Sequence, residues 1–311
     1  MQNPFKYSNT NKRYHTLDYY YKNRFHEKVF KVSLDAGFSC PNIDGTVGYN
    51  GCIYCSKLGS GEYAGNKEEP IEVQFHKVKE IMLKKWPKAK YIGYFQAHTN
   101  TYAKVEKLNE LYTKILNEPG VIGLNIATRP DAITEECLDY LTELNKKTYL
   151  TIELGLQTTN EKTSKLINRC HTLTCFEEMV NKLRERNIDV VVHIINGLPY
   201  EMLNTVKYLN SLDIQGIKIH MLSILKDTPL EKLYEKEHFK MLTKEEYIDI
   251  VIEQLEVLRP DIVIHRITGD PKVDDLVEPN WLIKKFGVLN DIDKEMAKRD
   301  TYQGKKLNES I

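Results

Sequence analysis

The sequence contains no run of about 18 uninterrupted apolar residues, so we expect no membrane-spanning helix. Its first residues, MQNPFKYSNTNKRYH, also lack the apolar segment of a secretory signal. Neither sign of charge is in excess, because 44 Lys and Arg balance 44 Asp and Glu, so net charge indicates no nucleic-acid partner. With no sign of export, the six cysteines predict a cytoplasmic protein whose thiols serve metal binding or catalysis more often than disulfides.

The chain also lacks internal repeats, low-complexity tracts and long flexible linkers. Short apolar, β-branched runs alternate instead with longer amphipathic segments. This alternation predicts βαβ units and a parallel sheet, and the pattern alone leaves a whole barrel, a partial (βα) barrel and a doubly wound sheet open. The expected strands are 29–34, 90–96, 121–128, 149–156, 189–197 and 216–222, and a seventh at 261–268 is left open. The expected helices are 71–86, 104–118, 134–147, 175–187, 200–212 and 243–258.

Polar loops follow the expected strands at their carboxyl ends, where folds of these kinds gather their functional groups. A loop that contains three cysteines begins six residues after the first strand. Together these loops predict an active site on one rim of the sheet. The other four loops are AHTNTY (97–102), TRPD (128–131), LQTTN (156–160) and GLPYE (197–201).

The cysteine loop, CPNIDGTVGYNGCIYC, places Cys40, Cys52 and Cys55 at C-x11-C-x2-C spacing. An x2 spacing lets a tight turn direct two thiolates at one centre, and Cys40 can close the loop as a third ligand. One interpretation is a zinc site, which would normally need a fourth ligand. No second CxxC follows, and Cys170 and Cys175 are candidates only at weak spacing. The other is a [4Fe–4S] cluster with three protein thiolates and one open iron. The residues alone leave both interpretations open.

The other motifs of the sequence are more specific than the cysteine spacing alone. A CxφC pair, in which Tyr54 is the aromatic φ, follows the first strand and resembles the radical S-adenosylmethionine (SAM) superfamily. The commonest spacing in that superfamily is C-x3-C-x2-C, so this sequence has eight extra residues between Cys40 and Cys52. An elongated first spacing also occurs in the Elongator catalytic subunit, a tRNA-modifying member. TRPD resembles the ETRPD of Elongator-type enzymes, with Ala127 in place of their glutamate.

Two later segments extend the resemblance. ELGLQTTNEKTSKLINR is similar to the fourth-strand segment of coproporphyrinogen-oxidase-like radical SAM enzymes, and HIINGLPYE resembles a fifth-strand motif that ends in GLPGE. Six motifs in order, CPNxDGTxGxxGCxxC, FQAxTNTYA, TRPD, ELGLQ, NRxHT and LKxTPL, resemble the YtqA/YhcC family, whose YtqA branch is called MnmL. The resemblance implies a partial (βα)6 TIM-like barrel over 28–270, with extensions at 1–27 and 271–311.

The resemblance also implies cofactors and site residues. The three cysteines would hold a [4Fe–4S] cluster, and SAM would chelate its open iron and release a 5′-deoxyadenosyl radical that abstracts hydrogen from the substrate. Independently, Glu153 lies in an apolar strand, where a carboxylate needs a partner or a role in a site. His193 and His220 lie on neighbouring strands, as core residues or as groups facing the barrel interior. The expected SAM contacts are Gln96, Thr99, Thr128, Glu153, Gln157 and Arg169, and the expected catalytic residues that touch substrate are His98 and Tyr102.

The substrate expectation rests mainly on the resemblance. An MnmL-type enzyme would convert 5-carboxymethylaminomethyl-(2-thio)uridine at the tRNA wobble position to the 5-aminomethyl form, with flavodoxin or ferredoxin as electron donor. The N-terminal segment and the tail WLIKKFG…KEMAKRDTYQGKK mix basic and aromatic residues, which suits single-stranded RNA or an ordinary surface with an aromatic staple. The alternatives are a radical SAM enzyme with another substrate and a non-catalytic zinc RNA-binding protein.

Overall fold

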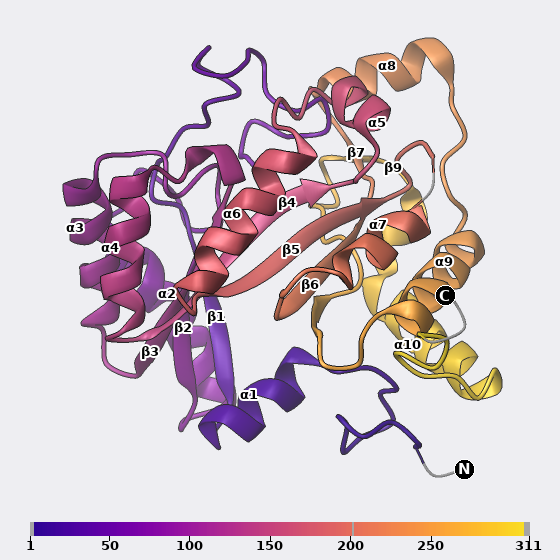
Figure 1. Ribbon diagram of the computed structural model, residues 1–311, viewed down its shortest axis with the longest axis horizontal. Coiled ribbons are helices and arrows are strands. Elements are labelled where there is room, and N and C mark those ends of the chain that lie inside the picture. Colours follow the sequence, from indigo (N-terminus) through magenta and orange to yellow (C-terminus); the bar gives the residue numbers. More distant parts are fainter. Residues whose placement is uncertain (1–2, 201, 308–311) are drawn as a thin grey trace.

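The computed structural model describes residues 3–200 and 202–307, and its centre is a curved parallel sheet (Figure 1). The strands follow the chain in the order β1-β2-β3-β4-β5-β6-β8, and each is parallel to its neighbours. Because the order never reverses, the sheet is an open half-barrel and has no switch point of the doubly wound kind. The expected partial barrel is confirmed. Its strands in the described residues are β1 (Val29–Leu34), β2 (Lys90–Phe95), β3 (Val121–Thr128), β4 (Tyr149–Gln157), β5 (Asp189–Asn196), β6 (Gly216–Met221) and β8 (Val263–Arg266).

The two faces of this sheet differ in chemistry. Residues such as Val32, Leu154 and Val192 belong to the main hydrophobic core, which the helices cover. Alternate positions on the same strands carry polar side chains, among them Glu153 and Lys218, and these line the interior of the half-barrel. Alternation therefore produces an apolar outer layer and a polar lumen, although the strands are buried on both faces.

Helices cover the outer face of the sheet and link its strands (Figure 1). Several begin after a threonine whose hydroxyl accepts the N–H three residues later, and at Thr243 a capping box with Glu246 is complete. No helix in the described ranges is long and apolar enough to cross a membrane. The helices are α1 (Leu17–Phe25), α2 (Ile71–Lys85), α3 (Val105–Leu116), α4 (Glu135–Asn145), α5 (Glu161–Leu166), α6 (Leu173–Glu185), α7 (Met202–Leu209), α8 (Pro229–Glu237), α9 (Lys244–Val257) and α10 (Lys285–Lys298), with short 3-10 turns η1 (Pro130–Ala132) and η2 (Asn280–Lys284).

The aromatic N-terminal segment packs at the amino end of the strands. Helix α1 touches both edge strands, β1 and β8. Tyr21 is buried against Val29 and Tyr149, which are the first residues of β1 and β4, and Phe25 lies 5.3 Å from Tyr149 between ring centroids. This part of the segment is therefore an aromatic staple that covers the closed end of the half-barrel. A small antiparallel pair, β7 (Ile224–Leu225) and β9 (Leu276–Glu278), lies beyond the other end of β6.

Candidate active site

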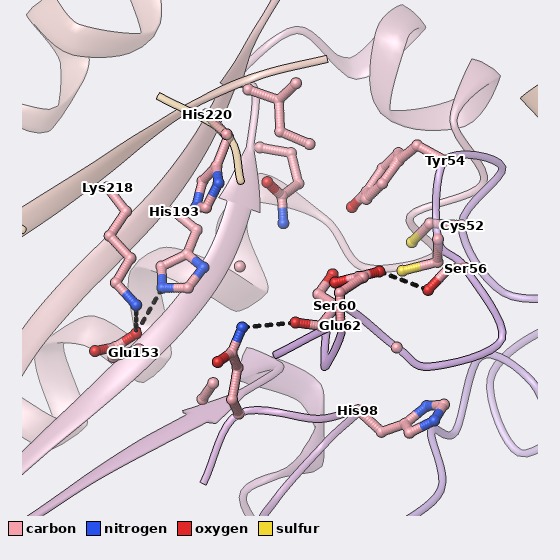
Figure 2. Close-up of a pocket in the computed structure, with 18 of the residues that line it drawn as sticks. Cys52, Tyr54, Ser56, Ser60, Glu62, His98, Glu153, His193, Lys218 and His220 are labelled. Atoms are coloured by element: carbon pink, nitrogen blue, oxygen red, sulfur yellow. Dashed lines mark hydrogen bonds and ion pairs between the residues drawn. The ribbon is translucent and has the colours of Figure 1, made fainter. Parts of the chain in front are cut away.

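A cavity of about 280 Å³ opens at the carboxyl ends of the strands (Figure 2). Its size approaches the lower end of the range for small-molecule sites, and its wall mixes apolar and polar groups as such sites do. Of the residues expected in the site, Tyr102 is absent from this wall, and its hydroxyl lies 2.6 Å from the Thr46 hydroxyl in the cysteine loop. Those that line the cavity are Cys40, Cys52, Cys55, Gln96, His98, Thr99, Thr128, Glu153, Gln157 and Arg169.

The cysteine loop is held against the segment after α5 by a reciprocal pair of asparagines. Asn42 donates from Nδ2 to the Asn168 carbonyl at 2.6 Å, and Asn168 donates from Nδ2 to the carbonyls of Gly51 (2.7 Å) and Tyr49 (3.0 Å). A Cβ on Gly48 would lie 2.2 Å from Asn42 Oδ1, so any larger residue there would displace the Asn42 side chain. The loop is irregular but fixed, because side-chain amides satisfy its backbone.

The three thiols of this loop are free and share the cavity. Asn42 Nδ2 also approaches Cys52 Sγ at 3.7 Å. Burial raises the pKa of the Cys52 thiol, and the neighbouring Cys40 and Cys52 add to the same effect at Cys55, so thiolates here need a cationic centre to share. Within residues 3–200 and 202–307, no three His, Cys, Asp or Glu side chains converge closely enough to hold one metal ion.

The loop after β2 supplies a second part of the wall. Gln96 donates from Nε2 to the Ser60 carbonyl at 2.7 Å, which ties this loop to the cysteine loop. His98 has a left-handed backbone (φ 58°), and its ring lies over Gly59, where an added Cβ would come within 2.4 Å of Nδ1. Thr99 is buried and its N–H donates to the Ser39 carbonyl at 3.2 Å.

The TRPD segment after β3 is fixed by its own side chains. The hydroxyls of Thr128 and Thr101 lie 2.6 Å apart, and Thr101 donates to the Ala132 carbonyl. Arg129 binds Asp131 with two hydrogen bonds, from Nε at 2.9 Å and from Nη2 at 2.7 Å. The bidentate pair sets the guanidinium in the cavity wall, close enough to Cys52 to oppose the rise in the pKa of that thiol.

Arg169 holds the end of β4 by binding backbone carbonyls. Its Nη1 donates to Leu156 and Thr158 at 2.6 Å each, and its Nε and Nη2 donate to His171 at 3.1 and 3.0 Å. Between the clamped carbonyls, Gln157 occupies a bulge with φ 68°, a strained conformation for this residue type. The hydrogen bonds of the Arg169 side chain thus mainly hold the backbone around Gln157 in position.

The floor of the lumen is built around one carboxylate. Glu153 Oε1 accepts from Lys31 Nζ and Asn125 Nδ2, each at 2.8 Å. Glu153 Oε2 accepts from Lys218 Nζ at 2.5 Å and from His193 Nε2 at 2.8 Å. These four bonds come from β1, β3, β5 and β6, so one buried side chain joins most of the sheet (Figure 2). The partner expected for Glu153 is present and its side chain lines the cavity, while its contact with SAM stays a prediction.

Burial and charge set the ionisation of this floor. Burial alone would raise the pKa of Glu153, but Lys218 and Lys31 outweigh it and hold the pKa well below its usual value. Burial lowers the pKa of Lys218 to about 7, with Glu153 opposing and Lys31 adding to the fall. Burial and the charge of Lys218 lower the pKa of His193 to about 4, so His193 is neutral and donates to Glu153.

Sequence reasoning missed the cations of the lumen. Lys218 lies inside the apolar strand GIKIHM, two residues before His220, so both share its inner face. The argument that singled out Glu153, a charge within an apolar strand, applies equally to Lys218 and could have found it. Arg266 carried the same signal in the run DIVIHRIT, but only if that run was accepted as a seventh strand.

Comparison with known proteins fits this geometry. Residues 46–212 match the radical SAM superfamily and residues 214–298 match the Radical SAM C-terminal domain. The chain belongs to the radical SAM superfamily. It is 51% identical over 307 residues to the uncharacterized protein YtqA of Bacillus subtilis, covering 97% of this chain and 95% of that one. It is 32% identical over 276 residues to YhcC of Escherichia coli, covering 87% and 88%.

Solved structures of this superfamily share the fold of the chain. The archaeal Elp3 of Methanocaldococcus infernus, lacking its N-terminus, has a TM-score of 0.64 and 16% identity, covering 89% of this chain and 64% of that one. At this identity the likeness concerns the fold alone. The radical SAM half-barrel is thus the framework on which the cavity described above is built.

Membership of the radical SAM superfamily implies a [4Fe–4S] cluster and SAM, and the donor set fits them. Cys40, Cys52 and Cys55 supply three thiols to one cavity, and thiolates are the ligands that hold Fe–S clusters. Gln96, Thr99 and Gln157 lie in the same cavity wall. Their contacts with SAM, like the catalytic roles of His98 and Tyr102, stay predictions. Glu201 of the GLPYE loop lies outside the described residues.

Proposed function

We propose that this radical SAM enzyme modifies tRNA, as an MnmL-type enzyme that converts 5-carboxymethylaminomethyl-(2-thio)uridine at the wobble position to 5-aminomethyl-(2-thio)uridine. One observation carries the proposal: three free thiols and a cation-rich lumen open into the same cavity. The thiols would hold the cluster that generates the radical, and the cations would bind a substrate that bears a carboxylate. The motif resemblance to the YtqA/YhcC family supplies the choice of nucleoside.

The roles of the residues follow from their positions. Cys40, Cys52 and Cys55 would hold the cluster, while Gln96 and Gln157 would orient SAM. When bound, the cluster and SAM supply a 5′-deoxyadenosyl radical. The protein keeps the reaction inside a walled cavity, and Asn42 and Asn168 keep the cysteine loop closed against that wall.

The proposed reaction balances as an oxidation followed by hydrolysis. The N–CH2–COO⁻ carbon of the substrate loses a hydrogen atom to the 5′-deoxyadenosyl radical, giving 5′-deoxyadenosine. The nitrogen and the carboxylate stabilise the remaining carbon radical, which loses one electron to a flavodoxin- or ferredoxin-class carrier and becomes an iminium ion. Water adds to the C=N bond, and the C–N bond breaks to give the aminomethyl group, glyoxylate and a proton.

RNA would approach at the mouth of the cavity. The aromatic staple of α1 lies at the opposite end of the strands, and Tyr21 is buried, so this part of the N-terminal segment is not offered to a base. At the mouth, the exposed side chains of Ile43 and Tyr63 line the cavity. The aromatic face of Tyr63 suits stacking by an unpaired base of an anticodon loop. We also retain 1–27, 28–270 and 271–311 as the proposed division of the chain.

The test follows the hydrogen atom. The anaerobically reconstituted enzyme is given SAM, dithionite and tRNA. The carboxymethylaminomethyl group of this tRNA is deuterated at the carbon between the nitrogen and the carboxylate. We expect deuterium in 5′-deoxyadenosine, glyoxylate in solution and the aminomethyl nucleoside in digested tRNA, all abolished by Cys52→Ala.

The outcomes separate the alternatives. Cleavage of SAM without transfer of deuterium from this tRNA, under conditions where the tRNA is bound, would assign the enzyme to another substrate. A protein that binds zinc and leaves SAM intact would be the RNA-binding alternative. Iron and acid-labile sulfide content, measured on the same sample, distinguishes these two results.

A further inference from the structure

The floor of the cavity holds more positive than negative charge. We call Lys31, Tyr94, Glu153, His193, Lys218, His220 and Arg266 the lumen cluster. Glu153 is its one carboxylate, and it faces the ammonium groups of Lys31 and Lys218. Tyr94 accepts from Lys218 Nζ at 2.8 Å but stays neutral, because burial raises the pKa of its hydroxyl well above the usual value.

Arg266 adds a third cation with no counter-charge. It is half-buried, lines the cavity and stands opposite Lys218 in the register of β6 and β8. In the described part of the chain, the side chain of Arg266 has no hydrogen bond and no ion pair, whereas Arg129 is paired with Asp131 and Arg169 binds carbonyls. The other carboxylates of the wall are engaged elsewhere: Asp270 by Lys285, and Glu62 by the Ser56 hydroxyl.

A neutral donor completes the set. His220 lies beside His193, with ring centroids 5.3 Å apart, and its Nε2 is buried without a hydrogen-bond partner in the described residues. An unsatisfied buried nitrogen costs free energy, and it is satisfied when a ligand brings an acceptor. Figure 2 shows His220 on the same side of the pocket as Lys218 and Glu153, with Cys52 on the opposite side.

The geometry points to an anion-binding subsite, formed by Arg266 with Lys218 and His220, for the carboxylate of the substrate. A guanidinium suits this role because its parallel N–H groups match the two oxygens of a carboxylate. Lys218 and His220 lie across the pocket from Cys52 (Figure 2), so a ligand bound to them leaves the space next to the cysteine loop for SAM.

This inference rests on the proposed function only for the identity of the carboxylate, so it is tested without tRNA. The probes are N-acetylglycine, a carboxylate, and N-acetylglycinamide, its neutral counterpart. Binding of each to the reconstituted holoenzyme with saturating SAM is measured by calorimetry or ligand-observed NMR. We expect the wild type to prefer the carboxylate, and Arg266→Gln to bind N-acetylglycine about 10- to 100-fold more weakly, as expected for one charge-assisted pair.

Matched variants identify the cause of any loss. Arg266→Lys keeps the charge and should recover part of the affinity. Lys57→Gln removes an 83% exposed cation outside the lumen, paired with Asp227 at 3.7 Å, and should leave binding of both probes unchanged. The [4Fe–4S] content of each variant reports on its folding. The affinity of each variant for SAM reports on the other source of a carboxylate, the methionine group of SAM.

Each outcome decides the inference. Equal binding of N-acetylglycine by wild type and Arg266→Gln, or no preference of the wild type for the carboxylate, overturns it. Loss of SAM affinity in Arg266→Gln, with binding of N-acetylglycine unchanged, also overturns it and assigns the lumen to SAM. If N-acetylglycine binds through Arg266 but deuterium is never transferred from the tRNA, the subsite stands and the proposed nucleoside falls.

Discussion

Lys218 donates a hydrogen bond from Nζ to Glu153 Oε2 at 2.5 Å, and both side chains are almost wholly buried in the lumen of the half-barrel. The pair joins β6 to β4 across β5, and Lys31 and His193 complete the shell of the carboxylate. A buried ion pair of this kind is weak evidence for stability, because desolvation opposes the attraction between its charges. Its place in the cavity wall gives the pair a second purpose, as part of a charged site.

Removal of the carboxylate should destabilise the fold. In Glu153→Gln, Lys31 and Lys218 lose their counter-charge, and we expect the free energy of unfolding to fall by about 3–5 kcal/mol. The loss should be smaller at about pH 9 than at about pH 6, because Lys218, whose pKa is about 7, is then already neutral in the folded state. Chemical denaturation at both pH values measures this. Glu143→Gln, an exposed carboxylate near Lys146, is the matched control and should leave stability unchanged.

Binding of the carboxylate probe should depend on pH through Lys218. The free protein protonates this amine below about pH 7, so affinity for N-acetylglycine should be highest there and fall by up to about tenfold as the pH rises to about 9. Glu153 stays ionised in this window, His193 has a pKa of about 4, burial holds the pKa of His220 well below its usual value, and burial raises that of Tyr94 well above its own. Burial also lowers the pKa of Lys31, so a variant is needed to separate the two amines. A Lys218→Met variant that kept the full slope would contradict this assignment.

Serine substitutions should separate cluster ligands from bystander cysteines. Cys40→Ser, Cys52→Ser and Cys55→Ser should each abolish stable [4Fe–4S] incorporation, because three thiolates are the whole protein contribution. Cys170 is the sharpest control, since its Sγ lies 2.8 Å from the position of a Cβ on Gly48, beside the cysteine loop. Cys170→Ser should retain the cluster, as measured by iron, sulfide and visible absorbance. Loss of the cluster there would show that the three-cysteine assignment is incomplete.

The asparagine that holds the cysteine loop should affect the cluster indirectly. Asn168→Asp removes the two Nδ2 donations to Gly51 and Tyr49 and places a carboxylate against their carbonyls. We expect a cluster that forms but is lost faster to a chelator, with global stability reduced only modestly. Asn160→Asp is the matched control, because Asn160 caps α5 through its side-chain oxygen and aspartate performs that task equally well. Equal rates of cluster loss in the two variants would argue against this role.

The strands were the most predictable part of the fold. The expected runs 29–34 and 121–128 coincide with β1 and β3, and the other expected strands differ from the observed ones by a residue or two at their ends. β-Branched runs bounded by polar loops carry this information locally. Helices α1, α5, α8 and α10 were not expected, since α5 is short and α1 and α8 owe their place to capping threonines and to packing more than to an apolar stripe.

Much of the candidate site was also accessible from the sequence, because its residues sit in motifs at strand ends. Spacing alone indicates that Cys52 and Cys55 share a centre, and a lone carboxylate in an apolar strand marks Glu153. The partners of Glu153 were not accessible: Lys31 is 122 positions away, Lys218 is 65 and His193 is 40. Their meeting depends on the curvature of the sheet, which brings inner faces of distant strands together.

The sequence by itself thus determined the alternation of strands and helices, the cysteine loop and the rim on which the site lies, because these depend on local pattern. Only the tertiary structure decided that the lumen holds an excess of cations, that Arg266 is left without a counter-charge in the described residues, and that the α1 aromatics close the opposite end. The physical reason is that charge balance in a buried space is a property of all the strands that enclose it. No single segment encodes that balance.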